Sequence, residues 1–321
     1  MRPHYYSLNE YLKDTYGEKM YKLSLNGGMT CPNRDGLIDT RGCIFCSAGG
    51  SGDFAGDAVN MKQLNNLCQS PTYTDYIDTI PAQISSAKSL IFNKYSGTAF
   101  IAYFQSYTNT YADTDYLHRL FYPVIMRDDI RILSIATRPD CLSDSTIELL
   151  AQLNQIKPVW VELGLQTIHE KTAEYIRRGY KLPVFESAVS KLLSVGIKPI
   201  VHIIIGLPGE TKDMLLDTAR YISHCGASGV KLQLLHVLKN TDLATDYNHG
   251  HFKTLSLETY TEYLADVIEL LPEDMVIHRL TGDGPKNLLV SPLWSTNKKN
   301  VLNTINTFFK KHNIIQGRNY Q

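Results

Sequence analysis

The apolar positions of this chain gather in six short runs rich in β-branched and aromatic residues, with helical periodicity between them. From the second run onward, the starts lie roughly 30–40 residues apart, which is the length of a strand–helix–strand unit. Most runs are apolar nearly throughout, as is typical of strands that are covered on both faces. The predicted strands are residues 20–25, 98–105, 130–136, 159–165, 198–205 and 230–235.

Helical segments with recognisable ends alternate with these runs. Apolar residues recur at helical spacing in residues 187–195 and 211–224. We expect Asp144 to cap a helix over residues 145–153, and Gly196 to end the helix before the fifth strand. Six such units predict an α/β fold, namely a partial (β/α)6 barrel, with a doubly wound sheet as the alternative.

The regular alternation weakens from about residue 240 onward. We therefore expect a core barrel over residues 1–240 and a C-terminal α/β extension, residues 241–321, packed on it. A glycine-rich segment within the core is expected to be irregular. The predicted elements of the extension are a helix at 257–271, an extra strand at 276–280 and a final helix at 297–311, and the glycine-rich segment is 47–72.

Charge is balanced over the whole chain but not along it. The 32 basic and 32 acidic residues give a formal net charge of zero, so no global field attracts the chain to nucleic acid. Beyond Asp283 there is no acidic residue, and this tail is locally basic. Its basic residues are Lys286, Lys298, Lys299, Lys310, Lys311 and Arg318.

No segment has the length or composition expected for insertion into a membrane. The longest apolar stretch, residues 197–207, is much shorter than the about 20 residues that cross a bilayer. The first ten residues lack the apolar centre of a signal peptide. We therefore expect a cytoplasmic protein with no membrane partner, in which clustered cysteines bind metal or take part in catalysis more often than they form disulfides.

Three cysteines, Cys31, Cys43 and Cys46, share a glycine-rich loop directly after the first predicted strand. A closed electron-transfer iron–sulfur cluster uses four protein thiolates, and only three are local here. Three thiolates leave one iron of a [4Fe–4S] cluster open to the amine and carboxylate of S-adenosylmethionine (SAM). A Cys3His zinc site is the alternative, although no histidine lies between Cys31 and Cys68. The remaining cysteines are expected to be small buried residues: Cys68, Cys141 and Cys225.

These motifs resemble a known family. The eleven-residue gap between Cys31 and Cys43, where the family usually has three residues, is similar to that of YhcC/YtqA-type (MnmL-like) proteins of the radical SAM superfamily. These proteins are related to the radical SAM domain of the Elongator catalytic subunit. The similar phrases extend over nearly the whole chain: residues 31–36, 104–110, 137–140, 162–166 with 178–179, 206–210 and 278–283.

The resemblance implies a radical SAM barrel, a [4Fe–4S] cluster on Cys31, Cys43 and Cys46, and SAM as second cofactor. It also implies an electron donor such as flavodoxin or ferredoxin. The implied cofactor-binding residues follow strand ends, where barrel enzymes gather their chemistry. They are Phe45 and Ile204 at the adenine, Gln105 and Ser106 where relatives receive the SAM amine, Gln166 at the ribose, Arg178 at the carboxylate, and Arg138 after the third strand.

The substrate is implied only by the same resemblance. It points to tRNA, with conversion of the carboxymethylaminomethyl group of the wobble uridine (U34) to aminomethyl. The basic tail is a candidate for phosphate contacts, and Tyr103, Tyr107 and Tyr111 are candidates for stacking on an extruded base. A radical enzyme for a small molecule or peptide remains an alternative, and a non-enzymatic cluster carrier would not need the SAM-site phrases.

Overall fold

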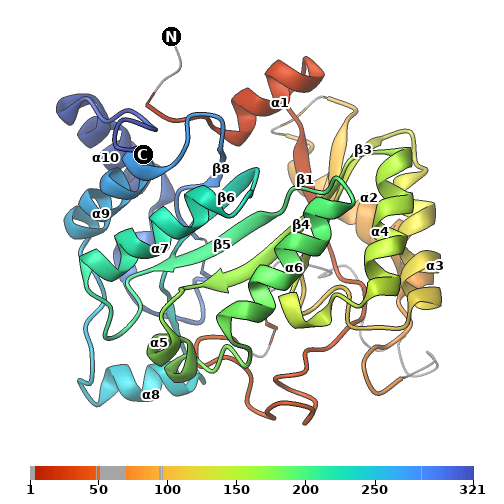
Figure 1. Ribbon diagram of the computed structural model, residues 1–321, viewed down its shortest axis with the longest axis horizontal. Helices are drawn as coiled ribbons and strands as arrows, with labels where there is room; N and C mark the ends of the chain where they lie inside the picture. The colour runs from red at the N-terminus through yellow and green to blue at the C-terminus, as the bar shows by residue number, and fades with distance from the viewer. Residues whose placement is uncertain (1–3, 48, 51–69, 94, 96, 283) are drawn as a thin grey trace.

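The computed structural model describes residues 4–47, 49–50, 70–93, 95, 97–282 and 284–321. Most of the glycine-rich segment therefore lies outside the described residues. Seven parallel strands form one sheet in the order β1-β2-β3-β4-β5-β6-β8 (Figure 1). They are β1 (Tyr21–Leu25), β2 (Phe100–Phe104), β3 (Ile130–Thr137), β4 (Val159–Gln166), β5 (Ile200–Ile205), β6 (Gly229–Leu234) and β8 (Val276–Arg279).

The strand order identifies a curled half-barrel and not a doubly wound sheet. In a doubly wound sheet the order reverses at a switch point, whereas here the strands follow one another across the sheet and every pairing is parallel. The predicted barrel is confirmed and has a seventh strand. The extra strand expected at 276–280 is β8, which pairs with β6. The extension thus completes the sheet, and the boundary at residue 240 stays a prediction.

Helices cover the outer face of the sheet (Figure 1). Helix α2 packs on β1, α3 on β3 and α4 on β4, and the apolar residues between these layers form the main core. A short antiparallel pair, β7 (Val237–Leu238) and β9 (Leu289–Ser291), was not predicted. The α-helices are α1 (Leu8–Tyr16), α2 (Ile80–Ile91), α3 (Thr114–Ile125), α4 (Asp144–Ile156), α5 (Glu170–Tyr175), α6 (Leu182–Ser194), α7 (Lys212–His224), α8 (Asp242–Asn248), α9 (Leu257–Leu270) and α10 (Lys298–His312).

Of the two predicted helix ends, the cap at Asp144 is wrong and the end at Gly196 is confirmed. The side chain of Ser143 accepts a hydrogen bond from the backbone N–H of Thr146 at 3.2 Å, so Ser143 and not Asp144 caps α4. Asp144 is instead the first helical residue, where its charge favours the amino end of the helix. Gly196 has a φ of 77°, and this left-handed conformation ends the segment after α6 as predicted.

Side-chain contacts across the inner face show how strongly the sheet is curled. The ammonium of Lys231 on β6 donates to the hydroxyl of Tyr103 on β2 at 2.8 Å. In a flat sheet with strands about 4.8 Å apart, β2 and β6 would be about 19 Å apart, beyond the reach of these two side chains. The inner face therefore closes on itself and encloses a space lined by side chains.

This interior is built in layers along the strands. Leu12 of α1 packs against the layer nearest the amino ends of the strands and closes that end of the barrel. The next layer is polar, and the last layer, at the carboxyl ends, lines cavities. The apolar layer contains Ile101, Ile132, Trp160 and Ile200; the polar layer contains Tyr103, Ser134, Glu162 and His202; the cavity layer contains Gln105, Ala136, Gly164 and Ile204.

Helix α10 runs from the carboxyl-end side of the sheet to the amino-end side. Just before the helix, Ser295 lies 3.2 Å from His236, which follows the carboxyl end of β6. Just after it, the side chain of Gln316 donates to the carbonyl of Met275, the residue before β8, at 2.8 Å. The first and last turns of α10 therefore face opposite ends of the barrel.

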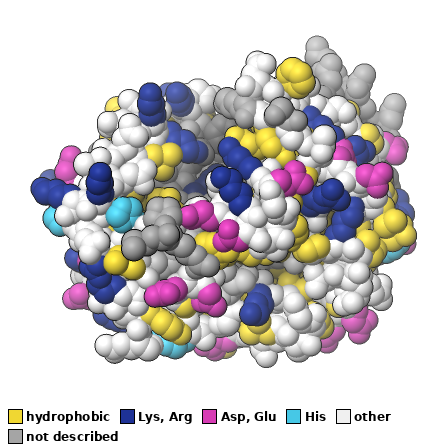
Figure 2. Space-filling view, turned by 90° about the horizontal axis from the view of Figure 1, so that it is seen from above, with side chains coloured by type: hydrophobic (Ala, Val, Ile, Leu, Met, Phe, Trp, Pro, Cys, Tyr) yellow, Lys and Arg dark blue, Asp and Glu magenta, His cyan; other side chains and the backbone are white. Residues whose placement is uncertain are grey.

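Among the described residues, no helix is both long and apolar enough to span a bilayer. The face seen in Figure 2 has Lys and Arg side chains interspersed with Asp and Glu. This mixture agrees with the zero formal net charge of the chain.

Candidate functional site

The three predicted ligand cysteines lie in one loop after β1. Cys31, Cys43 and Cys46 are partly buried, and all three line a cavity of about 190 Å³ at the carboxyl ends of the strands. Backbone hydrogen bonds fold the loop tightly: Arg34 N–H donates to the Cys31 carbonyl at 2.7 Å, and Cys46 N–H donates to the Cys43 carbonyl at 3.0 Å. The fold thus brings together the thiols that were expected to hold a cluster.

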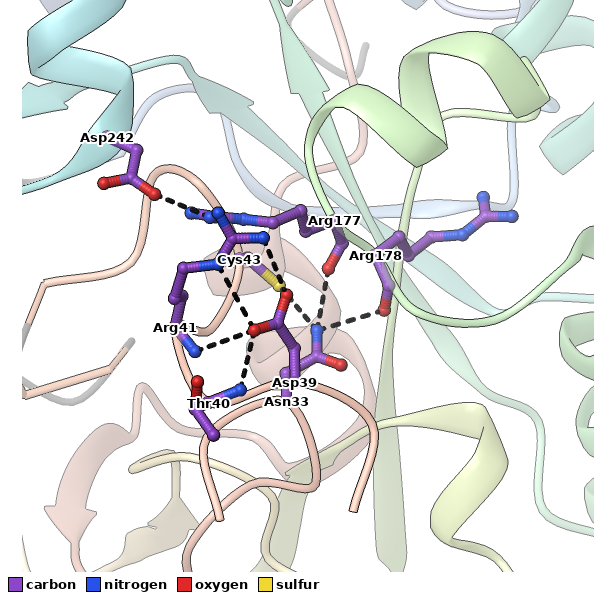
Figure 3. Close-up of polar contacts among 8 residues, drawn as sticks. All are labelled: Asn33, Asp39, Thr40, Arg41, Cys43, Arg177, Arg178 and Asp242. Carbon is purple, nitrogen blue, oxygen red and sulfur yellow. Dashed lines mark hydrogen bonds and ion pairs between the residues drawn. The ribbon is translucent and has the colours of Figure 1, made fainter. Parts of the chain in front are cut away.

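Asn33 fixes this loop against the turn after α5 (Figure 3). Its buried side chain donates to the carbonyl of Arg177 at 2.7 Å and lies 3.5 Å from the sulfur of Cys43. At Gly179, where φ is 81°, a Cβ would lie only 2.4 Å from Asn33 Oδ1. Glycine at this position permits the close approach, and Asn33 in turn positions Cys43.

Arg34 places a cation beside the same loop. Its Nη2 donates to the carbonyls of Cys46 and Ser47 at 3.1 and 2.5 Å. The guanidinium also lies 5.7 Å from the centre of the Tyr107 ring. Arg34 therefore holds the backbone at Cys46 in place and also adds positive charge near the thiols.

The surroundings of Cys43 favour a thiolate. A hydrogen bond from Cys46 lowers the pKa of Cys43 to about 6; burial opposes this shift, while Arg138, Asn33 and Arg34 add to it. Thiolates are the form that binds iron and zinc. No group of three His, Cys, Asp or Glu side chains in the described part of the chain is arranged to hold a single metal ion.

Most of the predicted SAM residues surround the same cavity. Its lining includes Phe45, Arg138, Gln166, Arg178 and Ile204 together with the cysteines. A second cavity of about 350 Å³ adjoins it, and Gln105 lines only this one. Ser106 is buried and is not among the described residues that line either cavity. Residues that line both cavities are Phe45, Cys46, Gly50, Ile204, Gln233 and Arg279.

Gln166 ends β4 in a conformation that points to a function. Its φ is 68°, which is uncommon for a residue other than glycine, and its Oε1 is buried without a hydrogen-bond partner. A Cβ at Gly164 would lie 2.8 Å from Gln166 Nε2, so Gly164 leaves room for the folded-back amide. A buried free acceptor beside the cysteines fits a ribose hydroxyl of SAM.

Arg178 is held mainly by backbone carbonyls. Its Nη1 donates to Thr167 at 2.6 Å and to Leu165 at 3.3 Å, and its Nε donates to Tyr180 at 3.0 Å. Its buried Nη2 makes no hydrogen bond, although it lies 3.5 Å from Glu170 in an ion pair. Backbone carbonyls and Glu170 thus surround the guanidinium, and a contact of Arg178 with the SAM carboxylate stays a prediction.

Arg138 is a rigidly held cation next to the cysteine loop. Its Nε and Nη2 donate to the two oxygens of Asp140 at 2.9 and 2.7 Å, and its Nη1 donates to the carbonyl of Arg178 at 2.9 Å. The centre of the Tyr180 ring lies 5.2 Å from the guanidinium carbon of Arg138 and 4.7 Å from that of Arg178. The donors and acceptors of this cavity thus suit a zwitterionic nucleoside such as SAM.

A charged network that sequence reasoning missed forms the floor of this cavity. Glu162 of β4 is fully buried and accepts hydrogen bonds from Lys22 at 2.7 Å and from Lys231. Ser134 donates to the same carboxylate at 2.6 Å, and His202 lies 2.8 Å from it. The sequence signal that could have found the network is a charged residue in the middle of a mainly apolar strand. Glu162 is such a residue in residues 159–166, and Lys231 is one in residues 229–234.

The network shifts the pKa values of Glu162, Lys231 and His202. Burial would raise the pKa of Glu162, but the charges of Lys22 and Lys231 hold it well below its usual range. Burial keeps the pKa of Lys231 well below its usual range, although Glu162 opposes this. Burial and the Lys231 charge lower the pKa of His202 to about 4, which keeps the imidazole neutral near pH 7.

The three candidate stacking tyrosines have different surroundings. Tyr103 belongs to this network, since it is buried and accepts a hydrogen bond from Lys231. It is therefore not placed to stack on a base, and that expectation was wrong for Tyr103. Tyr107 lines the cysteine cavity and packs beside Arg34. Tyr111 is partly buried, and burial raises its pKa to about 12.

Comparisons with known families match most of the chain. The model of the Radical SAM superfamily matches residues 40–222, and that of the Radical_SAM C-terminal domain matches residues 227–311. The first match includes Cys43 and Cys46 and begins after Cys31.

Similar proteins cover nearly the full length. YtqA of Bacillus subtilis, an uncharacterized protein, is 40% identical over 317 residues, which are 99% of this chain and 93% of that protein. Protein YhcC of Escherichia coli is 31% identical over 300 residues, which are 93% and 90% of the two chains. The tRNA uridine(34) acetyltransferase of Methanocaldococcus jannaschii is 25% identical over 185 residues, 57% of this chain and 33% of that enzyme.

Solved structures share the fold. The archaeal Elp3 of Methanocaldococcus infernus aligns with a TM-score of 0.66 at 18% identity, over 92% of this chain and 64% of that one. Methylornithine synthase (PylB) aligns with a TM-score of 0.51 at 12% identity, over 90% and 82%.

Proposed function

This chain belongs to the radical SAM superfamily, with a [4Fe–4S] cluster and SAM as cofactors, and we propose that it modifies the wobble uridine of tRNA. The proposed reaction converts the carboxymethylaminomethyl group of uridine 34 to aminomethyl, in the cytoplasm. When bound, the cofactors supply a 5′-deoxyadenosyl radical that takes hydrogen from carbon. The proposal includes an external electron donor such as flavodoxin or ferredoxin.

The residues of this chain have separate tasks in that reaction. Cys31, Cys43 and Cys46 hold the cluster, with Asn33 fixing the loop. The buried acceptor of Gln166 suits the ribose of SAM, and the cations of Arg178 and Arg138 suit its methionine end. The apolar layer at the amino ends of the strands closes the barrel beneath the site, which limits the access of water to a reactive radical.

The observation that carries the substrate assignment is the match to a tRNA uridine(34) acetyltransferase over 57% of this chain. The arrangement of the two cavities is consistent with a nucleoside substrate. Because they share Phe45, Ile204 and Arg279, a substrate in the larger cavity can place a carbon beside SAM in the smaller one.

Mass spectrometry of tRNA nucleosides tests this proposal. A strain that lacks this gene and any redundant pathway should accumulate carboxymethylaminomethyluridine at position 34 and lose the aminomethyl-derived forms. A plasmid copy with Cys225→Ala should restore the profile, whereas a copy with Cys43→Ala should not. Of these two cysteines, Cys43 is a proposed cluster ligand and Cys225 is not.

The alternative is a radical enzyme that acts on a small molecule or peptide. It predicts an unchanged nucleoside profile in the same strain, and that result would contradict the tRNA proposal. Purified enzyme, reconstituted and reduced, provides the second measurement, since it should convert carboxymethylaminomethyl tRNA from the deletion strain and release 5′-deoxyadenosine in parallel.

A further inference from the structure

The side chain of Gln233 lies where the two cavities meet. Gln233 belongs to β6, which lies beside β5 in the sheet (Figure 1), and its register partner on β5 is Ile204. Both residues line the cysteine cavity as well as the larger cavity. Among the described residues, this side chain makes one hydrogen bond, between its Nε2 and His202 Nδ1 at 3.2 Å. The carbonyl oxygen Oε1 of Gln233 therefore stays available to a molecule bound in the cavities.

The buried carboxylate of Glu162 decides which nitrogen of His202 carries a hydrogen. His202 Nε2 lies 2.8 Å from Glu162 Oε2. Burial opposes the ionisation of Glu162, but its ion pair with Lys22 at 2.7 Å helps to hold its pKa well below the usual range, so the carboxylate only accepts hydrogen bonds. Burial also keeps the imidazole neutral, with a pKa of about 4. A neutral imidazole has one N–H, so Nε2 donates to Glu162 and Nδ1 is left as an acceptor.

This tautomer in turn fixes the orientation of the Gln233 amide. Because Nδ1 of His202 is an acceptor, it faces the NH₂ end of the amide and not its carbonyl end. The two ends of an amide are nearly alike in size, so the surrounding hydrogen bonds decide which way it points. The chain of hydrogen bonds from Glu162 through His202 therefore presents an acceptor at the junction of the cavities, and not a donor.

An acceptor in this place favours a bound molecule that brings a donor. Phe45 and Ile204, which are apolar, line both cavities together with Gln233. In apolar surroundings an unpaired carbonyl oxygen costs more free energy than it does in water. A ligand with an N–H opposite Oε1 gains a hydrogen bond there, whereas a ligand with an ether oxygen at the same point places two acceptors against each other.

We propose that Oε1 of Gln233 accepts a hydrogen bond from an N–H of the substrate, and that His202 is the positioning residue that keeps this acceptor in place. This inference rests on the proposed function, in which the substrate is a uridine with a carboxymethylaminomethyl group. The amine nitrogen of that group is the donor that we assign to Gln233. The nitrogen is bonded to two methylene carbons, so the hydrogen bond holds both carbons at the junction, beside the proposed SAM site.

Two synthetic anticodon stem-loops test this hydrogen bond. One has carboxymethylaminomethyluridine at position 34, and in the other an ether oxygen replaces the amine nitrogen. We expect the reconstituted wild-type enzyme to bind the amine at least about tenfold more tightly in Kd, because the ether leaves Oε1 without a donor. Gln233→Leu should reduce this preference about tenfold, and any part that remains is due to the charge of the amine. Gln152→Leu, on the exposed surface of α4, is the matched control and should keep the wild-type preference.

A second variant, His202→Leu, tests the positioning of the amide. Without Nδ1 beside it, the amide of Gln233 can turn its NH₂ end toward the cavities and donate to the ether oxygen. The ether should then bind more tightly than it does to the wild type, and the preference for the amine should fall although Gln233 is intact. If His202→Leu weakens both stem-loops and leaves their ratio unchanged, the role of His202 is structural and the positioning is contradicted.

Two results with Gln233→Leu would overturn the inference. If this variant weakens both stem-loops equally, so that the ratio stays at the wild-type value, Gln233 contacts another part of the RNA. If it weakens SAM binding while the preference for the amine persists, Gln233 serves the cofactor. Melting temperature and iron content are measured for each variant, so that loss of folding is not mistaken for loss of recognition.

A measurement without RNA separates this inference from the proposed function. Labelling with ¹⁵N-histidine shows by NMR which imidazole nitrogen is protonated, and the signals of His202 are those that vanish in His202→Leu. We expect a protonated Nε2 and an unprotonated Nδ1 near neutral pH, with a shift of Nδ1 in Gln233→Leu but not in Gln152→Leu. A proton on Nδ1 would overturn the inference, even if tRNA is modified. Failure of the wild type to bind either stem-loop would contradict the proposed function, while the expected nitrogen signals would still support an acceptor at the junction.

Discussion

Individual cysteines of this chain are distinguished by their surroundings more than by their exposure. Cys43 receives hydrogen bonds and positive charge, whereas burial raises the pKa of Cys141 and of Cys225. However, Arg138 also acts on Cys141, and the hydrogen bond with Cys43 together with burial raises the pKa of Cys46. The proposed ligands are therefore separated from the other cysteines by their shared place in the loop after β1 and not by their pKa values.

The first prediction concerns cluster ligation. Cys31→Ala, Cys43→Ala and Cys46→Ala should each abolish the about four irons and the broad visible absorption gained on anaerobic reconstitution. Cys141→Ala and Cys225→Ala are the controls and should keep both signals. Cys68 is also expected to be dispensable, although it lies outside the described residues. Stoichiometric zinc in an anaerobic preparation would contradict the cluster assignment.

The second prediction concerns SAM. Gln166→Ala removes a buried acceptor that has no hydrogen-bond partner, and Arg178→Ala removes a guanidinium that lines the cysteine cavity. Each should weaken SAM binding about tenfold or more, because a lost charged or buried hydrogen bond is worth about 1.5–3 kcal/mol. Equilibrium binding of SAM to the reconstituted enzyme measures this, and iron content should stay at the wild-type level. Normal SAM affinity in both variants would show that these roles were assigned wrongly.

The third prediction concerns stability against pH. The pKa of His202 is about 4 in the fold and about 6.5 when the chain is unfolded. Between these values the unfolded chain binds more protons, so stability falls as pH falls. Lowering the pH from 6.5 to 5 should cost about 2 kcal/mol through this group, and His202→Gln should remove that part of the loss. Urea unfolding of the apoprotein at several pH values measures the difference, and parallel curves for the two proteins would contradict it.

At the scale of elements, local interactions decide at which residue a helix begins and on which face of the sheet a side chain lies. The cap of α4 is one residue from the predicted one because Ser and Asp both satisfy the cap pattern, and only the backbone conformation decides between them. A bulge in β8, where the register with β6 shifts, is a similar case, because the alternation of its side chains is broken by one unpaired residue.

The fourth prediction tests this cap. Ser143→Ala removes the hydrogen bond to the Thr146 N–H and should lower the free energy of unfolding by about 1 kcal/mol. Asp144→Ala is the neighbouring control, since it loses only a helix-end charge and an exposed ion pair with Lys191. Its cost should be a few tenths of a kcal/mol. Chemical denaturation compares the two, and a larger effect at Asp144 would show that it is the cap after all.

At the scale of the whole molecule, the orientation of α10 divides the basic tail. Lys298 and Lys299 begin the helix, just after a segment that contacts His236 beside the larger cavity. Lys310 and Lys311 end it, near the amino ends of the strands. A tRNA whose wobble base enters the cavities would pass nearer to the first pair than to the second.

The fifth prediction follows from this division. Binding of tRNA should weaken steeply with salt, because each neutralised phosphate releases counterion. Reversal of charge in Lys298→Glu/Lys299→Glu should lower affinity and reduce the salt slope by about 1 for each lost contact. Lys310→Glu/Lys311→Glu is the matched control and should change both much less. Equal effects of the two pairs would place the tRNA elsewhere on the surface.

The sequence alone determined the alternation of the main strands with helices, the barrel and the cysteine loop, but not the short pair β7 and β9. These features depend on periodicity, turn residues and motif spacing, which are local along the chain. It also named Gln166 and Arg178, which the fold places at one cavity with the cysteines. Only the tertiary structure decided that Glu162 lies among Lys22 and Lys231, and that Arg279 joins two cavities. The reason is the curl of the sheet, which brings strands β1, β4 and β6 together across the interior, and no local pattern encodes that distance.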